Sequence, residues 1–150
     1  MMFLPKTISI CLVASLSLGQ SVHSARLVVW LEAEQFDQTG GWSNDSQHVD
    51  IMGSPYLLAT GVGKPVKDAV TTARIVESGT YRLWVRSRDW LPEYAPGKFR
   101  VLVGGEPSSV TFGESPSDDW QWVDGGTFDL EAGDVEIRLD DLTGWWGRCD

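Results

Sequence analysis

Cysteine and histidine are scarce in this sequence. The 150 residues contain two cysteines and two histidines. Cys11 falls in an amino-terminal segment that we expect to be removed, so Cys149 would have no cysteine partner in the mature chain. His48 is the one histidine beyond that segment, so a Ser-His-Asp triad has no obvious parts. These absences exclude an internal disulfide and argue against an enzyme within these residues.

Basic residues are too few and too scattered for a nucleic-acid surface. The chain has 12 Lys and Arg against 21 Asp and Glu, and its formal net charge is −9. Proteins bind a phosphate backbone through clustered positive charge, which this sequence lacks. We therefore expect no nucleic-acid partner, whereas the surplus carboxylates suit a hard cation such as calcium.

The apolar run at the amino terminus is too short to span a bilayer. It covers residues 8–18, follows Lys6 and ends shortly before Val22-His23-Ser24. A spanning helix needs about 20 residues, whereas this order of basic, apolar and small residues is typical of a secretory signal peptide. We interpret residues 1–24 as that signal. The mature protein is then expected to be secreted or periplasmic, with no membrane partner after cleavage.

Helical periodicity is also missing, and short β-type runs take its place. Seven or eight such runs, about 8–12 residues apart, indicate an all-β sandwich that forms one domain over residues 25–150. Residues 37–55 and 89–98 lack the pattern and are predicted to be long loops. The predicted strands cover residues 27–34, 69–76, 80–88, 99–103, 109–112, 120–122, 127–130 and 135–139.

Eight tryptophans are the most unusual feature of the composition. Sugar rings present C–H faces that stack on flat aromatic rings, so indoles on loops suit a saccharide platform. An arginine beside them can hold hydroxyls or a uronate carboxylate. The alternative is that the rings cap the core or an interface. The candidate ligand-binding residues are Trp90, Trp120, Trp122, Trp146, Arg86, Arg88 and Tyr94.

Two carboxylates two residues apart form a second candidate site. On an extended strand, Glu32 and Glu34 would share one face about 6.6–7 Å apart. Such neighbours repel each other unless a cation or an arginine joins them. Calcium accepts strand carboxylates together with loop carbonyls. The pair is therefore either a calcium site or two solvated glutamates on an edge strand.

The order of several short motifs resembles that of carbohydrate-binding modules with a galactose-binding-like jelly roll. The motifs are Leu31-Glu32-Ala33-Glu34, residues 79–86 (GTYRLWVR), Val103-Gly104-Gly105 and Leu130-Glu131-Ala132-Gly133. The resemblance implies that Glu32 and Glu34 bind Ca²⁺ together with an Asp of the last strand, a position that Asp150 matches. It also implies a jelly roll that lacks its last strand, because the sequence stops at Asp150.

A closer resemblance is to the N-terminal module of large secreted bacterial FAD-dependent oxidoreductases, sometimes labelled xanthan-lyase-like. It is carried by Gly40-Gly41-Trp42, Gly63-Lys64-Pro65-Val66 and residues 52–58, 85–90, 141–144 and 147–150. It implies that the chain is a fragment and that FAD belongs only to a missing downstream part. No G-x-G-x-x-G fingerprint occurs in these 150 residues.

The expected function is therefore that of a non-catalytic module. It would bind a glycan, a poly- or oligosaccharide, and position its own downstream catalytic domain. The alternative is a structural module that packs on that domain and binds no glycan.

Overall fold

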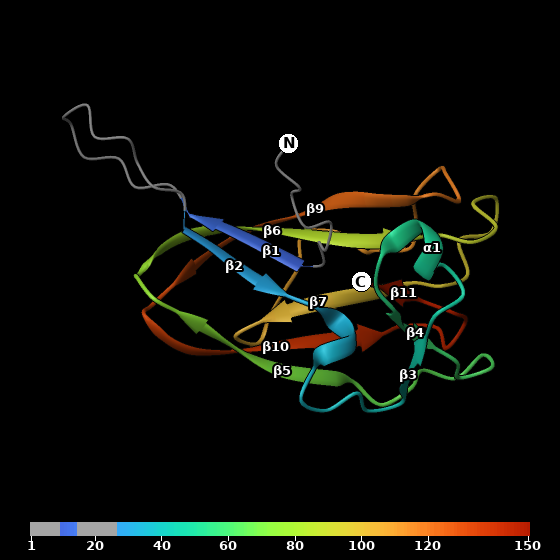
Figure 1. Ribbon diagram of the computed structural model, residues 1–150, viewed down its shortest axis with the longest axis horizontal. Coiled ribbons are helices and arrows are strands. Elements are labelled where there is room, and N and C mark those ends of the chain that lie inside the picture. The colour runs from blue at the N-terminus through green and yellow to red at the C-terminus, as the bar shows by residue number, and fades with distance from the viewer. Residues whose placement is uncertain (1–9, 15–26) are drawn as a thin grey trace.

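The computed structural model describes residues 10–14 and 27–150, which form a sandwich of two antiparallel β-sheets (Figure 1). The predicted all-β fold class is confirmed. Among the described residues, the seven-stranded sheet contains β1 (Ile10–Ala14), β2 (Leu27–Leu31), β3 (Trp42–Asp45), β4 (Tyr56–Ala59), β6 (Gly79–Arg88), β9 (Trp120–Leu130) and β11 (Arg148–Cys149). The four-stranded sheet contains β5 (Ala69–Ile75), β7 (Phe99–Val103), β8 (Glu106–Pro107) and β10 (Gly133–Asp141).

Alternation along the strands explains why the two sheets pack together. In β6, Tyr81, Leu83 and Val85 are buried, whereas the residues between them point away from the core. Strands β5 and β7 alternate in the same way, and Val101 is fully buried. Burying a side chain such as Leu83 contributes about 1.5–3 kcal/mol relative to leaving it exposed. The core therefore lies between the sheets, as the alternating pattern predicts.

The prediction of a loop over residues 37–55 is wrong. This segment contains β3 and a short helix, α1 (Val49–Met52), and β4 follows it. In β4 all four side chains are buried, so the strand has no polar face and its sequence does not alternate. A continuous apolar run of this length gives no periodic signal, which is why the pattern misses β4.

Three other predicted strand regions differ from the structure. The predicted strand 27–34 ends at Leu31 and continues as a 3₁₀ turn, η1 (Ala33–Gln35). Residues 109–112 contribute only an isolated bridge between Phe99 and Phe112. Residues 120–130 form one strand rather than two, because a β-bulge opposite the step from Leu83 to Trp84 takes up Gly125, while Gly126 pairs with Leu83.

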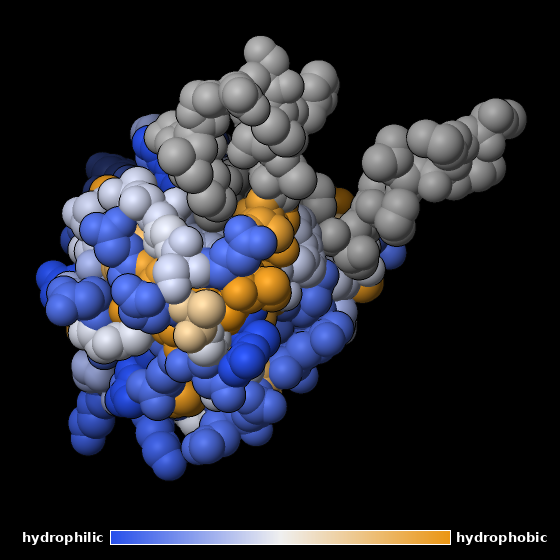
Figure 2. All heavy atoms as spheres, turned by 90° about the vertical axis from the view of Figure 1, so that its left-hand side faces the viewer, coloured by the Kyte–Doolittle hydropathy of each residue, from blue (hydrophilic) through white to orange (hydrophobic). Residues whose placement is uncertain are grey.

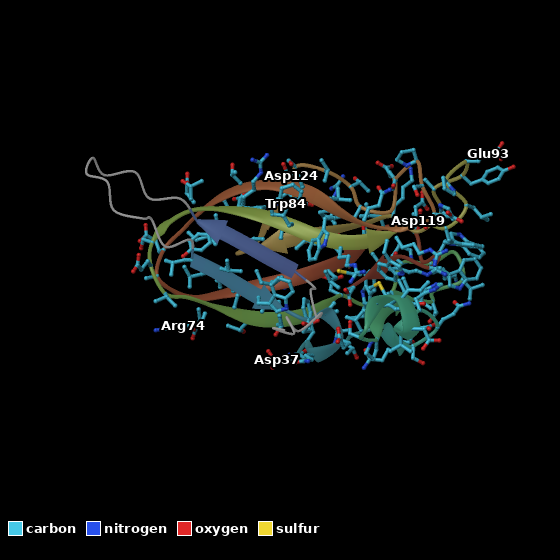
Figure 3. All side chains as sticks on the ribbon, turned by 45° about the horizontal axis from the view of Figure 1, so that its top comes forward. Asp37, Arg74, Trp84, Glu93, Asp119 and Asp124 are labelled. Carbon is cyan, nitrogen blue, oxygen red and sulfur yellow. The ribbon has the colours of Figure 1, made fainter. Side chains whose placement is uncertain are left out.

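The ends of the sandwich differ in their connections. At one end the pairs β5–β6, β7–β8 and β9–β10 are joined by short turns, while the other end carries α1, the short strands β3, β4 and β11, and the long loops (Figure 1). The predicted loop over residues 89–98 is confirmed and lies at this loop end. Figure 3 shows Glu93, from that loop, and Asp119, which precedes β9, at the same end.

The predicted signal peptide lies largely outside the described residues. Only residues 10–14 of it are described, and this strand pairs with β2 and β6. Cleavage after Ser24 stays a prediction. In the described part of the chain, no helix is long and apolar enough to cross a membrane.

Candidate functional site

The loop end of the sandwich is held together by Asp141, at the end of β10. This carboxylate is buried and accepts backbone hydrogen bonds from Val66 at 2.9 Å and from Gly144 at 3.0 Å. The loop after β10 is further tied to β4, because the backbone N–H of Trp146 donates a hydrogen bond to the carbonyl of Ala59 at 2.8 Å. Two segments far apart in sequence thus fix the loop that carries Trp145 and Trp146.

Backbone strain is concentrated in these loops. Val62, Leu91, Ala95 and Trp146 all have positive φ angles, between 41° and 60°. A residue with a Cβ atom in this region costs of order 1–2 kcal/mol relative to ordinary backbone. Such strain is kept only where the surrounding structure enforces it, and it is commonly found at binding sites.

Three tryptophans gather on these loops with an arginine. The rings of Trp90 and Trp146 meet edge to face with centroids 4.7 Å apart, and those of Trp145 and Trp146 lie 5.0 Å apart. The guanidinium of Arg148 lies 5.8 Å from the Trp90 ring centroid. Trp145 is 37% exposed. We call Trp90, Trp145, Trp146 and Arg148 the aromatic cluster.

Tyr94 lies in the same loop as Trp90 and is 70% exposed. In the described part of the chain, its ring does not pack against those of the cluster. The prediction that places Tyr94 at the ligand site therefore stays a prediction.

Trp120 belongs to a different group of rings. It packs against Tyr56 with centroids 4.9 Å apart and against His48 at 6.1 Å. Arg88, opposite Trp120 in the β6–β9 pair, has Nη1 2.8 Å from Nε2 of His48. Burial lowers the pKa of His48, and the charges of Arg88 and Arg148 lower it further. A neutral His48 can accept the hydrogen bond that Arg88 offers.

Trp122 and Arg86 lie apart from the aromatic cluster. Trp122 is on β9 opposite Arg86, and its ring lies 6.2 Å from that of Trp30. Nη1 of Arg86 is 3.5 Å from Oδ2 of Asp150. The predicted ligand-binding set is thus divided among three places, of which only the aromatic cluster brings together residues on the strained loops.

Glu32, Glu34 and Asp150 form a carboxylate cluster. Each residue contributes one carboxylate oxygen to the cluster, and these three oxygens lie within 4.8 Å of one another. Asp150 is fully buried and accepts a hydrogen bond from Ser54 Oγ at 3.0 Å. Glu32 accepts one from Trp30 Nε1 at 2.8 Å.

The local backbone explains how the two glutamates come together. The predicted extended strand would hold them about 6.6–7 Å apart on one face. That expectation is wrong, because the chain turns into η1 after Leu31 and Glu34 lies within the turn. The turn brings Glu34 and Glu32 together beside Asp150, which follows β11.

The electrostatics of the cluster favour a cation. The pKa of Glu34 is raised from 4.5 to about 7, first by burial and then by the charges of Glu32 and Asp150. Its Oε2 atom is buried, and among the described residues it has no hydrogen-bond partner. Arg86 offsets part of the negative charge through Asp150. Three converging carboxylates, one of which has a buried oxygen without a hydrogen-bond partner among the described residues, are a set of ligands that fits a hard cation.

Sequence reasoning missed several residues of this end, chiefly Arg148, Ser54 and His48. The signal for Arg148 was available, since it follows Trp145-Trp146-Gly147 directly. Ser54 gave no signal, because its contact with Asp150 joins residues 96 positions apart.

A scan against protein-family models finds no match, and a search of curated proteins also finds none. Solved structures are similar in fold. A β-(1,4)-mannanase of Podospora anserina that carries a family 35 carbohydrate-binding module matches with TM-score 0.61 and 24% identity, over 80% of this chain and 25% of that one. The chain thus spans about a quarter of the mannanase.

Two isolated family 35 carbohydrate-binding modules match over most of their own length. One, from an environmental isolate, has TM-score 0.56 and 18% identity over 77% of this chain and 86% of its own. The other, from Cellvibrio japonicus, has TM-score 0.55 and 17% identity with the same coverage of both chains. The described residues therefore have the jelly-roll fold of these modules.

Proposed function

We propose that this chain is a secreted carbohydrate-binding module whose glycan site is the aromatic cluster. The observation that carries this proposal is the gathering of three indoles on strained loops, beside the guanidinium of Arg148 on β11, at one end of the sandwich. Its fold, shared with carbohydrate-binding modules, supports the same function.

The chemistry of the cluster suits a sugar chain. An indole face is a flat apolar surface on which the C–H face of a pyranose ring stacks. Arg148, beside Trp90, supplies donors for hydroxyls or for a uronate carboxylate. A hollow lined by residues 110–116, Gln121 and Val123 opens elsewhere, beside β9, and has no cluster residue in its wall. The glycan would therefore lie across the rings and not in that hollow.

The carboxylate cluster would hold Ca²⁺. Glu32, Glu34 and Asp150 would be its protein ligands, and the ion would remove the repulsion among them. Because Glu32 follows β2 and Asp150 follows β11, the ion would join the first and last parts of the module. Its role in this proposal is to stabilise the fold.

The module would serve an attached catalytic body. The sequence resemblance points to an FAD-dependent oxidoreductase, with FAD held only beyond Asp150. The coding sequence downstream of Asp150 tests this part. An open frame with a G-x-G-x-x-G fingerprint after a predicted strand supports it, and a stop codon contradicts it.

A packing module is the competing function, and one observation favours it. Leu91 is 48% exposed and lies next to Trp90, so the loop end presents apolar surface that an attached domain could cover. Glycan binding by the purified protein separates the two functions, since a packing module has no need of it.

Affinity electrophoresis provides that test. The protein is run through gels that contain soluble mannan, xylan or a polyuronate, and retardation by at least one of them is expected. Trp90→Ala should weaken binding by roughly 30-fold, the effect of losing about 2 kcal/mol at a central aromatic contact. Trp84→Ala is the matched control, because Trp84 lies on the sheet (Figure 3) and the guanidinium of Arg82 lies 5.8 Å from its ring centroid. No retardation by any of the glycans, or equal losses in both variants, would contradict the proposed site.

A further inference from the structure

The segment between β3 and β4 is attached to the sheet through two of its side chains. It comprises residues 46–53 and includes α1, which Figure 1 shows at the loop end of the sandwich. Six of these eight residues are exposed, whereas Met52 is buried and His48 is half-buried. We call residues 46–53 the α1 flap. One of its two attachments is thus apolar, and the other is a titratable ring.

His48 contacts residues of three strands. Its ring stacks on that of Tyr56, in β4, with centroids 5.7 Å apart and an interplanar angle of 25°. It meets the ring of Trp120, in β9, edge to face at 6.1 Å. Nη1 of Arg88, in β6, lies 2.8 Å from its Nε2 and 3.1 Å from its Nδ1. Nε1 of Trp120 and Nε of Arg88 are buried and have no hydrogen-bond partner among the described residues. The contact between Arg88 and His48 is therefore a polar link that no second bond of these side chains replaces.

The charges that face His48 are mostly positive. Arg148, in β11, lies opposite Arg88, and neither arginine forms an ion pair with a carboxylate among the described residues. Asp45, at the end of β3, is the acidic group that acts on the ring, and its Oδ1 accepts a hydrogen bond from the backbone N–H of Gln47 at 2.7 Å. Burial, Arg88 and Arg148 lower the pKa of His48 below its ordinary value of 6.5, and Asp45 opposes them.

Protonation of His48 would reverse its contact with Arg88. A neutral imidazole has one nitrogen that accepts a hydrogen bond, whereas an imidazolium and a guanidinium have only donors. The two groups would then repel each other and share no hydrogen bond. The flap would keep Met52 and its two ends, because β3 pairs with β4 and Ser54 Oγ donates to Asp150 at 3.0 Å. The opening would therefore be local and leave the sandwich in place.

We propose that His48 is an acid-sensitive latch, whose protonation releases the α1 flap from Arg88 and uncovers Trp120. Trp120 is one of the indoles that the sequence marks as candidates for sugar contact, and in the closed flap His48 packs against it. This inference goes beyond the proposed glycan site, which consists of other rings. Its experiment contains neither glycan nor calcium, so the latch and the proposed function can fail separately.

Proton linkage fixes the direction of the effect. His48 has its ordinary pKa of about 6.5 in the open flap and a lower pKa in the closed flap, so the closed flap binds fewer protons. The ratio of open to closed flap is therefore constant well above pH 6.5. Below pH 6.5 it rises by about tenfold for each pH unit, until the lowered pKa is reached.

Hydrogen exchange followed by NMR, with a chelator present, measures this ratio. The backbone N–H groups of Ile51 and Met52 both donate to the carbonyl of His48 at 2.9 Å. A single helical turn is not stable by itself in water, so the protection of these two amides depends on the closed flap. Their protection factors should fall below pH 6.5 with the slope given above. The Nε1 signal of Trp120 should move over the same pH range.

The His48→Gln variant isolates the latch. Glutamine offers Arg88 an acceptor but does not titrate, and the variant keeps Glu34, whose pKa of about 7 falls in the same range. The difference between the unmodified chain and the variant is therefore the effect of His48, and protection in the variant should lack the fall below pH 6.5. An equal pH dependence in both chains, or no pH dependence in the unmodified chain, would overturn the proposal.

Two arginine variants keep the test decisive if His48→Gln does not fold. Arg88→Gln removes a positive charge beside His48, so the pKa of that ring, followed by its NMR signals, should rise toward 6.5. Arg82→Gln is the matched control, because Arg82 lies on the same strand but pairs with Asp124. A pKa of His48 that stays in place in Arg88→Gln, or that moves equally in both variants, would overturn the latch.

Discussion

At one end of the sandwich the pairs β5–β6, β7–β8 and β9–β10 are joined by turns of two or three residues, whereas at the other end long loops carry Trp90, Trp145 and Trp146. The turn end uses glycine where the backbone needs a positive φ, as at Gly104 and Gly105. The loop end places residues with side chains in that conformation. One end is thus built from relaxed backbone, and the other accepts strain around a group of rings.

The two ends also differ in their surfaces. Figure 2 faces the turn end and shows apolar atoms among hydrophilic ones. Val28, in β2, and Val76, which follows β5, are 52% and 69% exposed. At the loop end, aromatic rings and buried charges such as Asp150 lie together. The binding functions that we propose therefore both lie at the loop end, and none is proposed for the turn end.

The largest effect is expected for an alanine at Gly144 in the loop end. Gly144 has φ +71°, and a Cβ atom there would overlap the carbonyl oxygen of Lys64. Gly105, at the turn end, has φ +90° with open space around it. Gly144→Ala should cost about 3–4 kcal/mol, strain and overlap together, and Gly105→Ala about 1 kcal/mol. Equilibrium urea unfolding measures the loss of unfolding free energy in both variants. Equal losses would contradict the difference in backbone strain between the two ends.

Calcium should stabilise the loop end by a smaller amount. At a concentration 100 times its dissociation constant, the ion adds about 2.7 kcal/mol, or a melting-temperature rise of roughly 8 °C for a chain of this size. Glu32→Gln should abolish the rise. Asp134→Asn is the control, because Asp134 is an exposed carboxylate at the turn end that pairs with Arg74. Differential scanning calorimetry with and without chelator makes the comparison. A melting temperature that does not change with calcium would contradict the proposed metal site.

The next largest effect is expected for the change of the unfolding free energy with pH. The pKa of Glu34 is about 7 in the fold and 4.5 without it, so the folded state binds the extra proton between these values. Without metal, this carboxyl therefore lowers the free energy of unfolding as pH rises from 4.5 through 7. Because a cation competes with the proton, stabilisation by calcium should increase over the same range.

The Glu34→Gln variant isolates this contribution. His48 has a lowered pKa and acts in the opposite direction below pH 6.5, so the informative quantity is the difference between the unmodified chain and the variant. Urea unfolding at several pH values gives that difference. If it does not vary between pH 4.5 and 7, the carboxylates do not interact as described.

The smallest effect is expected for the ion pair at the turn end. Arg74 and Asp134 lie 2.8 Å apart with most of both side chains exposed. Solvent screens such a pair, so Arg74→Ala should change stability by less than about 0.5 kcal/mol. Urea unfolding in low and high salt checks this, and a loss above 1 kcal/mol would show that the turn end depends on charge more than its exposure suggests.

The sequence predicted the regular part of the fold because alternation is a direct consequence of a two-layer sandwich. Strands β5, β6, β7 and β10 follow that pattern and are confirmed. The pattern could not reveal β4, which is buried on both faces, or the bulge that lets β9 run continuously past Gly125 and Gly126. Both features depend on neighbours that are distant in sequence.

The candidate site was predictable only in part. The nearness of Glu32 and Glu34 could be read from their spacing, but the 3₁₀ turn that brings them together could not. The indoles were found by composition. Their division into separate groups depends on which strands are paired. Trp120, for example, lies opposite Arg88 in the β6–β9 pair and packs against Tyr56.

The most direct test of the central claim follows the indole N–H signals by NMR while a glycan that retards the protein is titrated in. The account predicts that the signals of Trp90, Trp145 and Trp146 shift with saturation, while that of Trp84 on the sheet stays in place. Shifts confined to Trp84, or no shift at any indole at saturating glycan, would contradict it.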